Sequence, residues 1–423
     1  MADSPHLPEG LYFWGQNRLG SLVPLLAHLV TYFGISPLLA VSLAHSAMGA
    51  LGVLLVIKIT KNYIAGILVA LVTLLPVWSM NYMAMPAQPY SSQFTLWMLL
   101  LYQLEKHGLS HTKNILLTSV TLFLLIWVSD ASIVALPIVT FQFWKEHNWD
   151  GKKWGVLMLL MTIYAILLLV VKNNLTHSNG YGDLPSLESL VTNLQALGEV
   201  LHFMPMMSSI ATALVLIGLV GILLFTSRNH ISNSTIVFGL LMLILTLSST
   251  WVAHNSPGNH RYFALPVTLI LAGLIARTPK KGVPYLTGTL VFLVGWSFFV
   301  THLIQVNGNQ FRLHKEAPTR AEADALSKNV EYPLIGNYWS VYLQMALNSE
   351  IEGSSINDWN ARNRWQFDQL LYSDTLQYTD INLPSSIDFY STEYRLISRD
   401  NDTGYFKLGT YIKATETVED FHQ

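Results

Sequence analysis

The sequence contains no cysteine and has few charged residues. The absence of cysteine excludes disulfides and thiolate chemistry. Only 12% of the 423 residues are charged, whereas soluble proteins carry about 25%. Hydrophobic residues make up 51% of the chain, and its mean hydropathy is +0.38. These values predict an integral membrane protein, and the net charge of -2 argues against a nucleic-acid partner.

Several sequence motifs are also missing. No G-x-x-x-x-G-K-[ST], G-x-G-x-x-G or H-E-x-x-H pattern occurs, which disfavours nucleotide-driven transport. No pair of spans broken by Gly or Pro occupies corresponding halves, as is typical of secondary transporters. The first ten residues, MADSPHLPEG, lack the basic and apolar regions of a cleavable signal peptide.

Charge divides the chain into two predicted domains. Residues 306–423 hold ten Lys or Arg and seventeen Asp or Glu, a net charge of -7. We interpret 1–305 as a transmembrane domain and 306–423 as an extracytoplasmic soluble domain. Partial alternation in "SSIDFYSTEYRLIS" and "TGYFKLGTYIKAT" predicts strands, so the soluble domain is expected to be α+β.

The apolar stretches predict an α-helical polytopic membrane protein with about ten transmembrane helices. A hydrocarbon core about 30 Å thick needs about 20 residues per helix. The predicted spans are 37–58, 63–80, 92–105, 114–129, 131–145, 154–172, 207–226, 234–254, 262–277 and 283–305. One set of alternate loops then holds eleven Lys or Arg and the other set three. The positive-inside rule therefore places both chain ends outside.

The outer side of the predicted membrane domain has three main parts. They are a first loop at 1–18, an interfacial helix at 19–34, and a loop at 172–206. Leucines at 187, 190, 194, 197 and 201 predict an amphipathic helix on the membrane surface within that last loop. An outside first loop with no signal peptide leads us to expect a further transmembrane helix upstream of Met1.

Three ionisable residues in the first half of the chain are candidates for chemistry on the outer side. Glu9 is a candidate general base or metal ligand, or a solvated carboxylate before an aromatic cluster. Arg18 is a candidate phosphate ligand, or an anchor among lipid headgroups. Asp130 in "WVSDASIVALP" is a candidate sugar or metal contact, or, like Ser129, a helix N-cap.

A second group of candidates lies in "HNSPGNHRYFALP". Arg261, like Arg18, is a candidate phosphate ligand or an anchor among lipid headgroups, and a helix that begins near it would point its positive N-terminus at an anion. His260 and Tyr262 flank this arginine and are candidate substrate contacts. The histidine spacing matches no strong zinc pattern, so no metal site is assigned, although Glu9 or Asp130 is compatible with a divalent metal ion.

The stretch "GSLVPLLAHLVTYFGISPLLAVSLAHSAMGALGVLLVIKITKN" resembles the early region of GT-C superfamily membrane glycosyltransferases, such as protein mannosyltransferases and lipid A aminoarabinose transferases. These have an acidic first outer loop, a Pro-containing interfacial helix, a G-x-S turn and a basic cytoplasmic loop. The corresponding residues here are Glu9, Pro24, Gly34 to Ser36, and Lys58 with Lys61. "MPAQPYSSQFTLWMLLLYQLEKHG" resembles the next outer loop and helix of the family.

The resemblance implies a transferase that moves a sugar from a polyprenyl-phosphate donor to a glycan, lipid or protein acceptor. It places the protein in a cell-envelope membrane, expected to be the bacterial inner membrane, with the reaction on the outer face. Three alternatives stay open. Two of them are a polysaccharide polymerase or ligase of another fold, and a membrane transporter or flippase. A third is a non-catalytic membrane scaffold whose tail binds partners.

Overall fold

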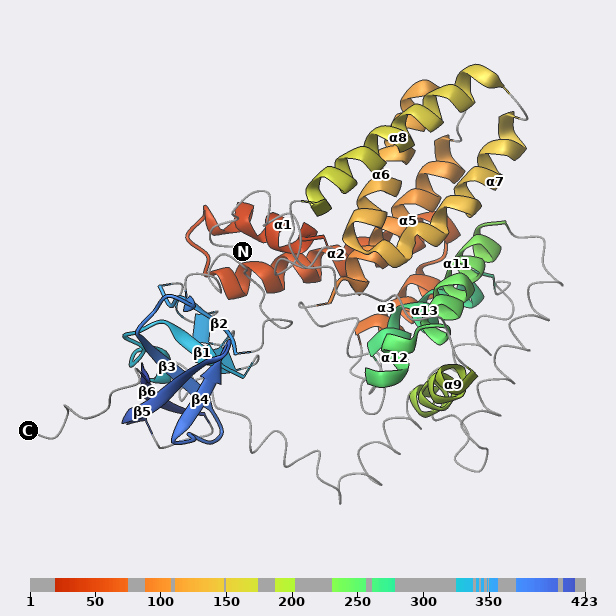
Figure 1. Cartoon of the computed structure of the whole chain (residues 1–423). Coiled ribbons are helices and arrows are strands. Elements are labelled where there is room, and N and C mark those ends of the chain that lie inside the picture. The colour runs from red at the N-terminus through yellow and green to blue at the C-terminus, as the bar shows by residue number, and fades with distance from the viewer. Residues whose placement is uncertain are drawn as a thin grey trace, which may run out of the picture.

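The structure is a computed structural model (Figure 1). It describes residues 20–74, 88–107, 111–147, 150–173, 187–201, 230–255, 261–277, 325–337, 340–341, 344–345, 348, 350–356, 370–401 and 406–414. The first loop at 1–18 and the predicted boundary between 305 and 306 lie outside these residues. The described helices precede residue 348, and the strands all follow residue 333.

Apolar sequence and local capping set the helices. Pro37 occupies the first position of α2, where its missing N–H costs nothing, and Lys61 in the left-handed conformation ends that helix. The helices are α1 (Leu22–Thr31), α2 (Pro37–Thr60), α3 (Tyr63–Leu74), α5 (Tyr90–His107), α6 (Thr112–Val128), the 3-10 helix η3 (Asp130–Val134), α7 (Ala135–His147), α8 (Gly151–Asn173), α9 (Leu187–Leu201), α11 (His230–Leu247), α12 (Thr250–Asn255) and α13 (Arg261–Arg277).

The prediction of about ten transmembrane helices is wrong. Among the described residues only Leu39–Thr60 and Gly151–Val170 are long and apolar enough to cross a membrane. Other apolar runs form helices of 10–17 residues, below the length of about 20 that a bilayer needs. The predicted span 131–145 is split into η3 and α7. The hydropathy pattern located the apolar stretches, but it did not show where each helix begins and ends.

The predicted span 92–105 falls within a core helix. From Tyr90 to Leu101 every residue of α5 except Leu99 is buried. It contacts α2, α6 and α13, and the ring of Trp97 stacks on Phe238 of α11 with centroids 4.1 Å apart. In Figure 1, α5, α6, α7 and α8 lie side by side. Burial inside a group of helices accounts for the apolar sequence of α5 without any contact with lipid.

The described strands form one six-stranded sheet that is separate in sequence from the helices. The strands are β1 (Leu334–Gly336), β2 (Gly353–Ser355), β3 (Thr375–Asp380), β4 (Ser386–Phe389), β5 (Thr392–Asn401) and β6 (Lys407–Lys413), in the spatial order β2-β1-β3-β6-β5-β4. β1 is parallel to both β2 and β3, and the other pairs are antiparallel. Tyr394 and Tyr411 are buried in the core of this sheet.

Gly336 allows β1 to approach β3 closely. Its φ of +154° lies in a region that side chains rarely adopt, and an added Cβ would lie 2.1 Å from the Thr379 carbonyl oxygen. We predict that Gly336→Ala lowers the free energy of unfolding by about 2 kcal/mol or more, measured by urea denaturation. Gly155→Ala is the control, because nothing lies within 4 Å of that position. Equal midpoints for the two variants would contradict the close approach.

Burial of Tyr411 predicts a loss of stability in alkali. Its hydroxyl donates to the Pro384 carbonyl at 2.6 Å, and desolvation raises its pKa from 10 to about 12, against the opposing charge of Arg399. Because folding favours the neutral phenol, this contribution is complete below pH 10 and is lost as the pH rises through about 12. Urea denaturation of Tyr411→Phe should show a shallower fall in stability across that window than the native chain. Parallel curves would contradict the assignment.

Candidate functional site

Gly20, which follows residues 1–19 (the front segment) in the sequence, is hydrogen-bonded to the turn between α6 and η3. Its N–H lies 2.9 Å from the Trp127 carbonyl oxygen and 3.2 Å from that of Val128. A Cβ at this position would lie 2.5 Å from the Trp127 oxygen, so only glycine fits the contact. Helix α1 follows directly and packs through Val23 and Ala27 onto the start of α2. We call the packed helices from α1 to α13 the helix group. Residue 20 is therefore fixed at the end of the helix group where α6 stops.

Buried polar side chains cluster at the same end. Ser91 of α5 hydrogen-bonds His45 of α2, with Oγ and Nδ1 3.1 Å apart. Gln93 donates through Nε2 to Ser132 Oγ of η3 at 2.9 Å. The Ser92 hydroxyl is buried and has no hydrogen-bond partner. We call these five residues the polar cluster. Burying polar groups is costly unless they are paired, so the α2–α5–η3 contact is specified by hydrogen bonds as well as by packing.

Asp130 is the first residue of η3 and is half-buried beside this cluster. It lies two residues before Ser132, which holds Gln93. The alternative that Ser129 caps the following helix is not supported, because its side chain makes no capping hydrogen bond. The structure thus brings Asp130 and Gly20 to the same turn. Sequence reasoning missed His45, Ser91 and Gln93, since nothing in the pattern of α2 or α5 shows which polar residues face each other.

The opposite end of the helix group carries many lysines. Ile115 of α6, Phe143 of α7 and Leu157 of α8 form one cluster, so α6 and α8 begin where α7 ends. Helix α5 ends there too, because it joins α6 through a short connection. Lys61 after α2 is close enough to Glu105 of α5 to interact electrostatically. We call this the basic end, and its lysines are Lys58, Lys61, Lys106, Lys113, Lys145, Lys152 and Lys153.

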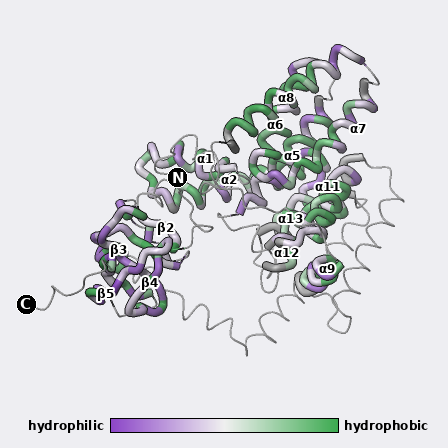
Figure 2. Tube along the Cα trace, in the orientation of Figure 1, coloured by the Kyte–Doolittle hydropathy of each residue, from purple (hydrophilic) through white to green (hydrophobic). Residues whose placement is uncertain are grey.

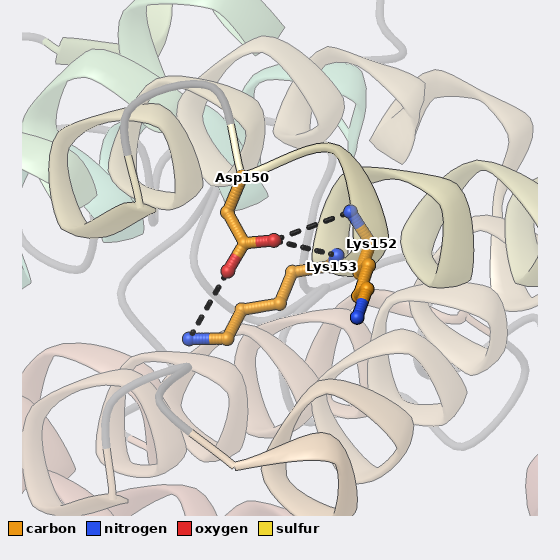
Figure 3. A network of polar contacts seen from close by, with 3 residues as sticks. All are labelled: Asp150, Lys152 and Lys153. Atoms are coloured by element: carbon orange, nitrogen blue, oxygen red, sulfur yellow. Dashed lines mark hydrogen bonds and ion pairs between the residues drawn. The ribbon is translucent and has the colours of Figure 1, made fainter.

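Asp150 organises the start of α8 at the basic end. Its Oδ1 accepts hydrogen bonds from the backbone N–H groups of Lys152 and Lys153, at 3.2 and 3.4 Å (Figure 3). Its Oδ2 lies 3.8 Å from Lys153 Nζ. This is an N-cap, which satisfies donors that a helix leaves unpaired at its start. The carboxylate fixes where α8 begins and leaves the lysines in its first turn.

The second group of candidates lies at the start of α13 (Arg261–Arg277). Arg261 is the first residue of α13, as the predicted helix start requires, and Tyr262 packs against a cluster formed by α9, α11 and α13 that includes Phe263. Asp130 borders a different cluster, through its neighbours Ala131 and Val134. Ala264 and Leu265 of α13 belong to that cluster too, and Leu271 packs against both clusters, so α13 contributes to both. Glu9, Arg18 and His260 lie outside the described residues.

The predicted amphipathic helix is present as α9. Its Leu197 is buried against α11 and α12, while Leu187 and Leu190 are exposed. Asn193 is fully buried and donates through Nδ2 to the carbonyl oxygens of Thr246, Leu247 and Ser249, the last two at 3.0 Å. One amide thus bonds three carbonyls around the end of α11, two of which, those of Thr246 and Ser249, also accept a backbone N–H. This contact makes α9 a fixed part of the helix group.

No three His, Asp or Glu side chains of the described ranges gather where they could hold a metal ion. Comparison of the chain with protein-family models and with curated proteins finds no match. The resemblance to GT-C glycosyltransferases therefore stays a prediction. In the structure, one end of the helix group is the basic end. The opposite end carries the polar cluster, Asp130 and Gly20.

The attachment of the front segment can be tested by cross-linking, because the native chain contains no thiol. Arg18 and Asp130 are each two residues from the hydrogen-bonded pair Gly20 and Val128. We predict that Arg18→Cys with Asp130→Cys is cross-linked in high yield by a short bis-maleimide. Arg18→Cys with Lys113→Cys, at the basic end, is the control. Equal yields for the two pairs, compared by protease digestion and gel mobility, would contradict the contact.

Proposed function

We propose that the chain is a membrane-bound glycosyltransferase that moves a sugar from a polyprenyl-phosphate donor to an acceptor hydroxyl on the outer face of the membrane. One observation carries the proposal: Gly20 is hydrogen-bonded to the Trp127 and Val128 carbonyls, next to Asp130, and Arg18 precedes Gly20 by only two residues in the sequence. In this proposal Glu9 supplies a base, Arg18 a cation and Asp130 a second carboxylate at one end of the helix group. That end also holds the polar cluster.

Helix α8 supports the membrane location. Its span Gly151–Val170 is only 6% buried, so this helix is not a core element of the helix group. Leu159, Ile166 and Leu169 are each more than half exposed, and Figure 2 colours most of the helix as hydrophobic. Such a surface is costly in water and suits the lipid hydrocarbon. The lysines of the basic end then face the cytoplasm, which leaves the polar cluster on the outer side.

The proposed reaction is a single displacement. The Glu9 carboxylate takes the proton of the acceptor hydroxyl as the acceptor oxygen forms a bond to the anomeric carbon. The bond from that carbon to the donor phosphate oxygen breaks, and the electron pair leaves with the phosphate. Arg18 stabilises the charge that develops on the phosphate. Attack opposite to the leaving group inverts the anomeric centre, and no nucleotide is required.

Asp130 and the polar cluster have supporting roles in this proposal. The half-buried Asp130 carboxylate accepts hydrogen bonds from sugar hydroxyls and fixes the donor beside the front segment. The His45–Ser91 and Gln93–Ser132 bonds hold α2, α5 and η3 together, and so keep the turn that carries Asp130 in place. Preorganisation of this kind lets binding energy orient the reacting groups.

The base assignment is tested with the full-length chain in membranes. Membranes that contain it are incubated with polyprenyl phosphates carrying radiolabelled mannose, glucose or aminoarabinose, and label entering acceptors is counted. We predict that Glu9→Gln lowers transfer by about 10²-fold or more, because general base catalysis contributes at least that much. Asp3→Asn is the matched control, since it also neutralises a carboxylate of the front segment.

Two results would overturn the proposal. Full transfer by Glu9→Gln would remove Glu9 as the base. Transfer from none of the lipid-linked donors, by a chain that resists extraction from membranes with alkaline carbonate, would remove the glycosyltransferase function itself. Release of the native chain by alkaline carbonate would overturn the membrane location that α8 supports.

A further inference from the structure

The parallel part of the sheet, β2-β1-β3, has the strand order at which parallel sheets commonly bind ligands. β1 is followed by the helical residues 340–341 and 344–345 and then by β2, which pairs on one side of β1. β3 comes next in the chain and pairs on the other side. In parallel sheets, ligands bind outside the carboxyl ends of the strands where the order reverses in this way. Here that position lies between the ends of β1 and β3.

A row of three residues crosses the sheet at these carboxyl ends. Gly336 of β1 is in register with Ser355 of β2 and with Thr379 of β3. In-register neighbours project to the same face of a sheet, so two hydroxyls flank a position that has no side chain. Ser355 is 1% exposed and Thr379 is fully buried, and neither hydroxyl has a hydrogen-bond partner. Unpaired buried hydroxyls are rare and need an explanation.

The helical residues after β1 cover this same face. A Cβ added to Gly353 would lie 3.1 Å from Val341 Cγ1, and Gly353 shares its face with Ser355, two residues on. The Ser340 hydroxyl donates to the Thr379 carbonyl at 2.9 Å. Gln344 follows Val341 by three residues and Ser340 by four, so it projects from the same side of the helix. Both its amide oxygen and its amide nitrogen are buried without a partner.

We propose that the Gln344, Ser355 and Thr379 side chains form a binding site for the hydroxyl groups of a neutral sugar. The two hydroxyls and the amide offer donors and acceptors but no charge, which matches a group that both donates and accepts hydrogen bonds. This site goes beyond the proposed transfer chemistry and does not depend on it, because it lies in the sheet and needs no lipid-linked donor.

The uncharged donors and acceptors of the three side chains favour a neutral ligand over an anion. Asn337 follows Gly336 directly and is exposed at the carboxyl edge. Asp380 follows Thr379 directly and therefore projects to the opposite face of the sheet, where the Tyr378 hydroxyl donates to its Oδ2 at 2.9 Å. That carboxylate is consequently not part of the proposed site.

The experiment measures binding of methyl glycosides to the full-length chain in detergent micelles by saturation-transfer NMR. The probes are methyl mannoside, methyl glucoside and methyl galactoside, with galacturonate as the charged comparison. We expect saturable binding of at least one neutral glycoside with a Kd of about 1 mM. Thr379→Val and Ser355→Ala should each weaken it about three- to tenfold, the effect of one neutral hydrogen bond. Gln344→Met is a third variant of nearly unchanged volume.

Thr410→Val is the matched control, since its hydroxyl on the same sheet already donates to Asp400. It should lower the thermal unfolding midpoint and leave binding unchanged, whereas Thr379→Val should leave that midpoint unchanged or raise it. Three outcomes would overturn the site: no saturable binding of any neutral glycoside, binding that all three variants retain, or a midpoint loss in Thr379→Val equal to that in Thr410→Val. Loss of transfer activity in the membrane assay would not affect these readouts, so the two proposals fail separately.

Discussion

The burial of α5 on nearly all sides is the constraint on which the helix group depends. A helix surrounded by other helices cannot leave polar side chains to water, so a buried polar side chain is costly unless it finds a partner among its neighbours. Ser91 and Gln93 do so across two interfaces, to His45 and to Ser132. The Trp97 ring, fully buried and stacked on Phe238, adds α11 to the same core. The positions of α2, η3 and α11 therefore follow from what α5 must pair with.

The two ends of the helix group differ in a way that apolar packing alone does not require. The basic end gathers lysines from five helices and one connection, and Asp150 holds two of them in the first turn of α8. The other end holds buried hydrogen bonds and the glycine contact that attaches the front segment. Under the proposed membrane location, the two ends would face different surroundings, and the division between them would then have a physical use.

The sequence predicted what local periodicity controls. The start of α13 at Arg261 and the amphipathic helix α9 follow from spacing and helix-start signals, as does strand formation in the two alternating stretches near the C-terminus. The sequence-based prediction failed where the length of a helix and the groups packed around it decide whether it spans a membrane or lies in the core. α5 and α8 both show apolar runs, but one is a core helix and the other exposes leucines over its length. The pairing of His45 with Ser91, and the register of Ser355 with Thr379, join positions far apart in the chain, which no single-sequence pattern reveals.

The bond network of Asn193 has a consequence for how the chain is made. Its three carbonyl acceptors lie 53 to 56 residues further along the sequence. Translation proceeds at about 5–20 residues per second, so the acceptors leave the ribosome roughly 3–11 s after Asn193 does. During that interval Leu197 and Ala196 have no partner to cover them. A membrane surface or a chaperone that shields this apolar stripe during synthesis would therefore protect the chain from aggregation before α11 arrives.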